Sequence, residues 1–265
     1  MKRKGIISIL SVILFFLMNI AAYPQEKEEE VNTGEDFTRP PNRFDTGFQY
    51  VDMVGDFEST VITARVDKTI LLDGGWQLAL RADLPYMWPD VPSAENPPSG
   101  ENQAGLSDFL TQAALILPKK GMWQMAFGLR MIFPTASKDQ TGTGKYLLLP
   151  TAGVKYDLGD WLKGAWTGVV TRYATDIGGD DDRPYISESI IQPYFHIDLP
   201  KLWFLTFSPE TRYDWRVEKW HVPFNIVVGK MITRKIVTSI EYKQAIVKDL
   251  PLYEKSVEFH VGFFF

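Results

Sequence analysis

The chain has 265 residues, a formal net charge of -5, 14% aromatic residues and no cysteine. The lack of cysteine excludes disulfides, cysteine-ligated metal and a lipid-anchored N-terminus. The mildly acidic balance argues against nucleic-acid binding, and the length predicts a single domain.

The N-terminus has the three parts of a secretory signal peptide. A basic start at residues 1–4 precedes an apolar run to Ile20, and the small residues Ala21 and Ala22 follow. This order is typical of exported proteins, so we expect residues 1–22 to be removed. A membrane anchor is the alternative, but the apolar run is short for a spanning helix.

Residues 23–42 contain several glutamates, and we interpret them as an acidic periplasmic leader without fixed structure. From Phe44 onward, apolar and polar residues alternate with a period of two, which indicates strands with one apolar face. The first strands are expected over residues 44–54 and 58–71, and the third begins at Trp76. Residues 89–103 are rich in proline, serine and asparagine, so they predict the first long loop.

Short turns and long loops then follow in regular alternation. Further strands are expected over residues 109–117, 123–133, 146–158, 161–173, 191–199 and 203–215, in a hairpin over 222–247, and over 256–265. The count is about 12, and an even number is expected of a bacterial transmembrane β-barrel.

The last strand indicates the class of the fold. Its apolar residues fall on one face: Val257, Phe259, Val261, Phe263 and Phe265. A transmembrane barrel ends in this way because lipid-facing and lumen-facing residues alternate and no sheet edge stays open in hydrocarbon. We therefore predict an all-β, antiparallel up-and-down barrel over residues 43–265, in the outer membrane of a Gram-negative cell. We expect the barrel assembly machinery to recognise Phe259, Val261, Phe263 and Phe265 as the membrane-insertion strand.

Four tryptophans support the same class. Each lies at or just after a short turn and on the predicted outer face: Trp76, Trp123, Trp161 and Trp203. Indole rings at one depth predict an aromatic girdle in contact with outer-membrane lipids and lipopolysaccharide.

Charged residues of both signs fall on the predicted inner face. The candidates for lining the lumen and contacting a solute are Arg65, Asp67, Arg81, Asp83, Arg130, Arg172, His196, Glu210, Arg212, Asp214 and Glu258. A 12-strand barrel has a backbone radius of roughly 12 Å, so these side chains would fill much of it and a wide porin is not expected. The pairs would either brace the barrel or form a constriction that selects small solutes, and the two roles are compatible.

Four groups of short motifs occur in order along the last three-fifths of the chain. They are Gly-Leu-Ser-Asp at residues 105–108, Phe-Pro-Thr-Ala at 133–136 with Gly-Thr-Gly-Lys at 142–145, Gly-Asp-Asp-Asp-Arg at 179–183 with Gln-Pro at 192–193, and Tyr-Asp-Trp at 213–215 with Trp-His-Val-Pro at 220–223. Together they resemble the MetA-pathway phenol-degradation family of outer-membrane proteins. The resemblance implies a transporter, and it alone suggests hydrophobic or aromatic solutes.

We therefore expect a channel or transporter for small molecules, without enzyme activity, cofactor or metal. A structural or surface barrel with a plugged lumen is one alternative. A lipid hydrolase is another, although no outward serine and histidine pair is apparent among the three histidines. A soluble β-sandwich is a third, which the girdle, the loop alternation and the aromatic terminus together argue against.

Overall fold

The computed structural model describes residues 32–265, apart from residue 56 and residues 91–103. The predicted signal peptide and most of the predicted first long loop lie outside the described residues. Within the described part, no helix is long and apolar enough to cross a membrane. Four short 3-10 helices occur in the connections: η1 (Asp73–Gly75), η2 (Asp139–Thr141), η3 (Gly159–Trp161) and η4 (Pro200–Leu202).

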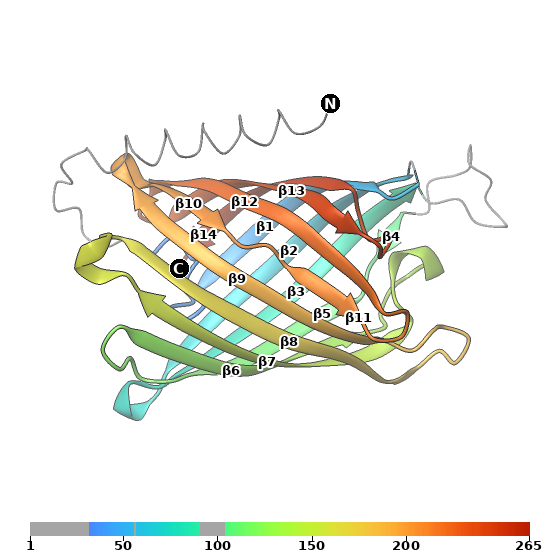
Figure 1. The fold of residues 1–265 in the computed structure, drawn as a ribbon, viewed down its shortest axis with the longest axis horizontal. Coiled ribbons are helices and arrows are strands. Elements are labelled where there is room, and N and C mark those ends of the chain that lie inside the picture. Colours follow the sequence, from blue (N-terminus) through green and yellow to red (C-terminus); the bar gives the residue numbers. More distant parts are fainter. Residues whose placement is uncertain (1–31, 56, 91–103) are drawn as a thin grey trace.

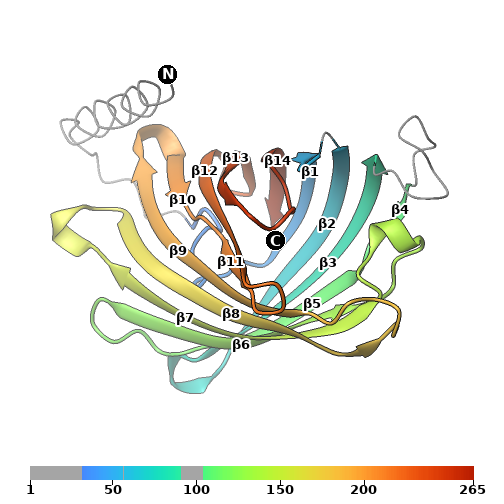
Figure 2. The ribbon, with the colours of Figure 1, turned by 45° about the vertical axis from the view of Figure 1, so that its right-hand side comes forward.

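The strands form one antiparallel sheet that closes on itself (Figure 1). β1 pairs with β2 on one side and with β14 on the other, and Figure 2 shows β13, β14, β1 and β2 side by side. Closure leaves no edge to be satisfied in lipid. The bounds are β1 (Arg43–Met53), β2 (Phe57–Leu71), β3 (Gln77–Asp90), β4 (Gly105–Leu106), β5 (Phe109–Ile116), β6 (Trp123–Phe133), β7 (Lys145–Asp157), β8 (Ala165–Gly179), β9 (Ser187–Leu199), β10 (Trp203–Phe207), β11 (Thr211–Asp214), β12 (Lys219–Thr233), β13 (Ile236–Lys248) and β14 (Lys255–Phe264).

These 14 segments make a barrel of 12 strands, because two barrel strands are interrupted. β4 and β5 both pair with β3, and β10 and β11 both lie between β9 and β12. The second interruption contains Pro209, which has no N–H for the ladder, and the adjoining strands carry Pro193 and Pro223. The prediction of an antiparallel barrel of about 12 strands is confirmed.

The two ends of the barrel differ in their connections. One end carries η1, η3, η4 and the turns at residues 117–122 and 234–235, and we call it the short-turn end. The opposite, long-loop end carries the loops at residues 134–144 and 180–186. β1 begins at the short-turn end, and the C-terminus lies at the same end, on the left in Figure 1.

The first long loop begins later than predicted. β3 continues through Pro89 to Asp90, and Pro89 pairs in register with Ser59 of β2. The other neighbour of β3 at this height is the short β4, whose pairing ends at Met87, so the missing N–H of Pro89 faces no ladder. Proline is tolerated at such an edge position, and therefore it does not end the strand here.

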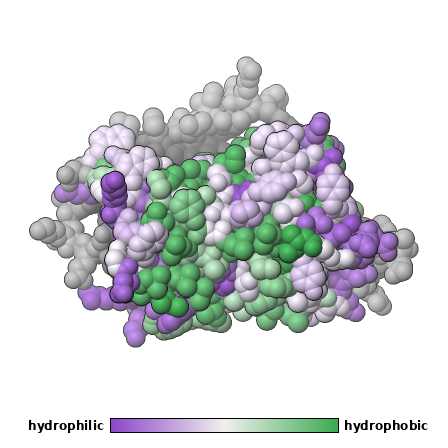
Figure 3. Space-filling view, turned by 90° about the horizontal axis from the view of Figure 1, so that it is seen from below, coloured by the Kyte–Doolittle hydropathy of each residue, from purple (hydrophilic) through white to green (hydrophobic). Residues whose placement is uncertain are grey.

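The outer surface carries the predicted apolar band. Large apolar side chains project outward from every sector, among them Ile62, Leu84, Met125, Phe127, Ile240, Val257, Phe259 and Phe263. Figure 3 shows hydrophobic residues gathered across the middle of one outer face, with hydrophilic residues toward both ends. This distribution fits a hydrocarbon layer between two polar interfaces.

The lumen holds apolar as well as charged side chains. One buried cluster, on β7, β8 and β9, consists of Leu147, Leu149, Ala174 and Ile190. A second, on β10, β12 and β13, consists of Phe204, Val227, Met231 and Val237. Both lie on inner faces, where the alternation predicted mainly polar residues. The barrel therefore has a partly filled interior.

The leader differs from its prediction. Residues 32–42, which we call the plug, lie inside the short-turn end, with Thr38 0% exposed and Asp36 8% exposed. Thr69 Oγ1 donates a hydrogen bond of 2.6 Å to the carbonyl of Pro40, which ties the plug to β2. The expectation of a solvated segment is wrong for these residues, because Asp36 pairs with Lys155 of the barrel and Thr38 is fully buried.

Candidate functional site

A chamber of about 350 Å³ lies in the lumen, on the side of the plug that faces the long-loop end. Its floor is formed by plug residues from Gly34 to Pro41, and its walls by inward side chains of most barrel strands. Six basic and seven acidic side chains line it, so the chamber has no single-sign field and its chemistry depends on local pairs. The volume suits one small molecule rather than a wide stream of solvent.

The β1–β3 wall carries a ladder of ion pairs. Arg65 donates two hydrogen bonds of 2.9 Å to the carboxylate of Asp83, its neighbour in register on β3. One step away, Arg81 donates to both carboxylate oxygens of Asp67, at 2.6 and 3.2 Å. Arg43 lies 2.7 Å from Asp45 and 3.6 Å from Asp67. The two bidentate pairs join β2 to β3, and Arg43 links β1 to β2 through Asp67.

A second network surrounds Glu210, in the break between β10 and β11. Arg212 donates to Glu210 Oε1 at 2.6 and 3.0 Å, and Arg172 lies 3.4 Å from the other carboxylate oxygen. Arg172 also donates to the side chain of Gln192 at 3.1 Å. The break frees the carbonyl of Ser208, which accepts from Gln192 at 3.3 Å. Side-chain hydrogen bonds thus take the place of the backbone ladder where the strand is interrupted.

A third network lies on β13 and β14. Glu241 and Glu258 face each other in register, and His260 Nε2 lies 3.1 Å from Glu258. Ligand atoms of these three residues lie within 4.8 Å of one another, a spacing that could hold a metal ion. The ammonium of Lys243 already lies 2.7 Å from Glu241 and 3.8 Å from Glu258. We interpret the cluster as an internally neutralised ion network.

Arg130 is different from the other chamber arginines. Its guanidinium donates two hydrogen bonds, of 3.0 and 2.8 Å, to the side-chain oxygen of Gln112. Among the described residues it forms no ion pair, whereas Arg43, Arg65, Arg81 and Arg172 each have a carboxylate partner. Arg130 is half-buried and has no ion-pair partner among the described residues, so it is the chamber's strongest candidate for contact with an anionic solute.

The plug is anchored to β7, β8 and β9 by a charge and an aromatic ring. Asp36 forms an ion pair with Lys155, which is 4% exposed and also lies 2.8 Å from Asp157. The Phe37 ring lies 5.8 Å from the Trp166 ring and 5.4 Å from the Tyr194 ring. Burial in the lumen raises the pKa of the neighbouring Glu35 carboxyl. The plug therefore closes much of the short-turn end.

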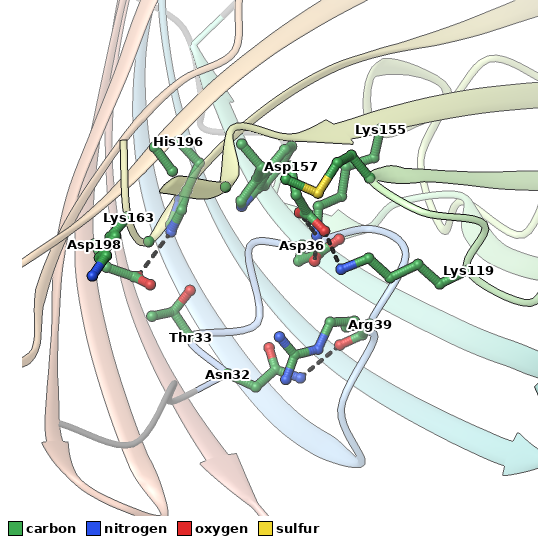
Figure 4. A pocket seen from close by; sticks show the side chains of 15 residues that line it. Asn32, Thr33, Asp36, Arg39, Lys119, Lys155, Asp157, Lys163, His196 and Asp198 are labelled. Atoms are coloured by element: carbon green, nitrogen blue, oxygen red, sulfur yellow. Dashed lines mark hydrogen bonds and ion pairs between the residues drawn. The ribbon is translucent and has the colours of Figure 1, made fainter. Parts of the chain in front are cut away.

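A second cavity, of about 340 Å³, lies on the other side of the plug, at the opening of the short-turn end, which we call the mouth. Figure 4 shows Asn32, Asp36 and Arg39 of the plug facing Lys119, Lys155, Asp157, His196 and Asp198 of the barrel. His196 lies 2.8 Å from Thr206 and 3.2 Å from Asp198, and its ring stacks on Trp166. This histidine belongs to the mouth and not to the chamber.

The structure brings most of the predicted lumen residues together. Those that line the chamber are Arg65, Asp67, Arg81, Arg130, Arg172, Glu210 and Glu258. Asp83 and Arg212 are the ion-pair partners of Arg65 and Glu210. Asp214 lies apart, because its carboxylate accepts from the backbone N–H of Arg216 at 2.7 Å and shapes the turn after β11. Solute contact by these residues remains a prediction.

The predicted girdle residues all lie at the short-turn end. Trp76, Trp123, Trp161 and Trp203 are 37, 51, 84 and 43% exposed. Sequence reasoning missed a second aromatic group at the long-loop end, where Tyr213 packs on Trp215 and Trp220 at 4.8 and 4.7 Å. The signal was present, since both tryptophans flank a short turn between alternating strands.

Comparison with known proteins agrees with this architecture. A family model described as "Putative MetA-pathway of phenol degradation" matches residues 42–220. No curated protein matches the chain.

Solved structures with the same fold include an outer membrane channel from Pseudomonas putida F1, at a TM-score of 0.70 and 12% identity, covering 87% of this chain and 98% of the channel. The NanC porin matches at a TM-score of 0.59 and 13% identity, covering 84% of this chain and all of the porin. Outer membrane phospholipase A from Escherichia coli matches at 0.50 and 11% identity, covering 94% and 96%. A likeness at such low identity shows the fold alone, which is that of an outer-membrane β-barrel.

Proposed function

The chain belongs to the MetA-pathway phenol-degradation family, and on this premise we propose that it is an outer-membrane channel for small solutes that bind in the lumenal chamber on their way through. The observation that carries the proposal is the chamber itself. It is large enough for one small molecule, and its wall presents the guanidinium of Arg130, which forms no ion pair with any residue that the structure describes. Ion-paired neighbours hold the rest of the wall rigid around it.

The chamber supports selection by contact rather than by net charge. Because acidic and basic side chains are nearly equal in number, a solute gains little from the average field. An anionic group beside Arg130 gains charge-assisted hydrogen bonds, which contribute about 1.5–3 kcal/mol each. We therefore expect weak overall ion selectivity together with specific retention of small acids.

The first experiment is single-channel recording of the refolded protein in a planar bilayer, with small carboxylates added as blockers. We expect discrete conductance steps and a block that depends on carboxylate concentration. Arg130→Gln is expected to weaken the block about tenfold, as loss of one charge-assisted contact predicts. Lys120→Gln is the matched control, because Lys120 is exposed in a short turn outside the chamber.

A barrel that folds and remains silent would contradict the channel and favour a structural barrel. That second candidate has a specific observation behind it, since the plug and the two lumenal apolar clusters fill much of the interior.

We further propose that the protein is not a lipid hydrolase. His196 and His221 are 3 and 1% exposed, and His260 lines the chamber. A hydrolase of this fold would need a histidine beside a serine where lipid can reach it. A lipid-hydrolysis assay on the refolded barrel checks this proposal, and release of fatty acid would contradict it.

A further inference from the structure

The seat of the Phe37 ring is built from backbone as well as side chains. Gly153 of β7 and Gly168 of β8 lie beneath the ring, and a Cβ at Gly153 would come within 2.8 Å of Phe37 Cε2. A Cβ at Gly168 would lie 3.3 Å from Phe37 Cε1. Trp166 and Tyr194 flank the ring. We call these residues, together with Lys155, the cradle.

The cradle also provides a cation at a defined distance from the ring. Lys155 lies two residues beyond Gly153 on β7, which corresponds to about 7 Å along a strand. Its ammonium lies 5.5 Å from the centre of the Trp166 ring and pairs with Asp36. Asp157, its other carboxylate partner, is shared with Lys119. The cradle therefore holds an aromatic ring and a carboxylate at once, both supplied by neighbouring plug residues.

We propose that the cradle is a binding site for an aryl carboxylate whose acid group is separated from the ring by a short linker, and that Asp36 and Phe37 occupy this site from within the chain. The proposal rests on the proposed channel function and names its solute class. Each contact of the plug has an equivalent in such a molecule. The ring takes the glycine-floored seat between Trp166 and Tyr194, and the carboxylate takes the place of Asp36 on Lys155.

The arrangement makes the plug a competitor of the solute. Asp36 and Phe37 are tethered to β1 through six residues or fewer, so their effective concentration at the cradle is in the millimolar range. A free aryl carboxylate must exceed that competition, and hence it binds weakly to the native protein. Vacating the cradle by mutation is expected to reveal the intrinsic affinity.

The test is isothermal titration calorimetry on the full-length folded barrel in detergent, with 3-phenylpropanoate as the probe. The double variant Asp36→Ala, Phe37→Ala is expected to bind the probe at least tenfold more tightly than the native protein. Cyclohexanepropanoate, which lacks the aromatic ring, is expected to bind several-fold more weakly, and propanoate to give no measurable heat. Heat-modifiable gel mobility verifies that each variant is folded.

Two further substitutions in the vacated background identify the site. Gly153→Leu projects a side chain into the ring seat, since the atoms nearest its Cβ belong to the side chains of Phe37 and Val170. Lys155→Met removes the ammonium while keeping the length of the side chain. Each is expected to lower the affinity for 3-phenylpropanoate at least tenfold. Equal affinity for the three probes, or no gain in the double variant, would overturn the proposal.

Calorimetry separates this proposal from the channel. Tighter probe binding by the double variant of a barrel that never conducts would support the cradle as a binding site and contradict the channel function. Conductance without tighter binding in the double variant would support the channel function and contradict the cradle as a binding site.

Discussion

Asp67 illustrates how single residues make a charged lumen stable. It is 3% exposed, accepts two hydrogen bonds from Arg81 and lies 3.6 Å from Arg43. The cations around this carboxylate stabilise it at such a depth, since an unpaired buried charge is strongly disfavoured. The pairs on β1, β2 and β3 therefore constrain one another, and removing one member costs more than removing both.

Replacing Arg81 tests this dependence. Arg81→Met is expected to lower the free energy of unfolding by about 2–3 kcal/mol, because Asp67 stays buried with its main partner gone. The double variant Arg81→Met, Asp67→Leu is expected to recover most of the loss. Urea unfolding in lipid vesicles, followed by tryptophan fluorescence, measures both. Lys119→Met is the control, since the Lys119 side chain is half exposed and Asp157 keeps Lys155 as a second partner, so the loss is expected to stay under about 1 kcal/mol. Additive effects of the two substitutions would contradict the coupling.

Residue-level prediction from sequence was accurate where alternation decides the outcome. The inward direction of Arg65, Arg81 and Arg130 follows from a period of two once the barrel is assumed. Pairing could not be predicted, because it depends on the register between strands. Among the described residues Arg130 forms no ion pair, and this distinguishing feature appears only when its neighbours in the barrel are placed.

Among the elements, β14 has the clearest assignment from sequence. Its outward residues Val257, Phe259 and Phe263 are exposed as the closing strand predicts, and it pairs with both β1 and β13. The backbone N–H of the terminal Phe265 donates to the carbonyl of Asn42 at 3.1 Å. The last residue is therefore fixed by a backbone contact, while its ring remains 66% exposed.

We predict that the Phe265 ring serves assembly more than stability. Phe265→Ser is expected to lower the amount of protein in the outer membrane of expressing cells several-fold, because the assembly machinery would lose its terminal aromatic residue. Unfolding of the refolded variant is expected to change by under about 1 kcal/mol, since the N–H bond to Asn42 is kept. Phe263→Ser, on the lipid face of the same strand, is the comparison and is expected to lower both quantities. Equal membrane levels for native protein and Phe265→Ser would contradict the prediction.

Other elements show where a local pattern is insufficient. β6 spans Trp123–Phe133, as its alternation predicts, whereas β8 continues to Gly179, well past its expected end at residue 173. The last residues of β8 include Thr175, Asp176, Gly178 and Gly179, and Ile177 is the one large apolar side chain among residues 175–179, so the apolar alternation fades before the strand ends. Hydrophobic alternation marks the membrane-embedded part of a strand and not its full length.

At the scale of the whole molecule, the sequence predicts the barrel better than it predicts the plug inside the barrel. Closure, strand number and the outer band follow from local periodicity. The position of the plug does not, because it depends on contacts between Phe37 and glycines more than 110 residues away. Residues 32–42 belong to a segment with the composition of a disordered leader, and contacts with Lys155, Trp166 and Tyr194 inside the barrel reverse that expectation for them.

The plug should also control passage through the whole barrel. The deletion of residues 24–41 leaves Asn42 in place, which accepts from Phe265 and Thr69, so the barrel keeps its closure. Single-channel conductance is expected to rise several-fold, because the floor of the chamber and much of the short-turn mouth are removed together. Gel mobility before heating is expected to stay that of a folded barrel, since every ladder between strands is intact. An unchanged conductance in a folded deletion variant would contradict the prediction, because it would show that the plug is not the narrowest part of the path and that the side chains of the barrel wall limit passage instead.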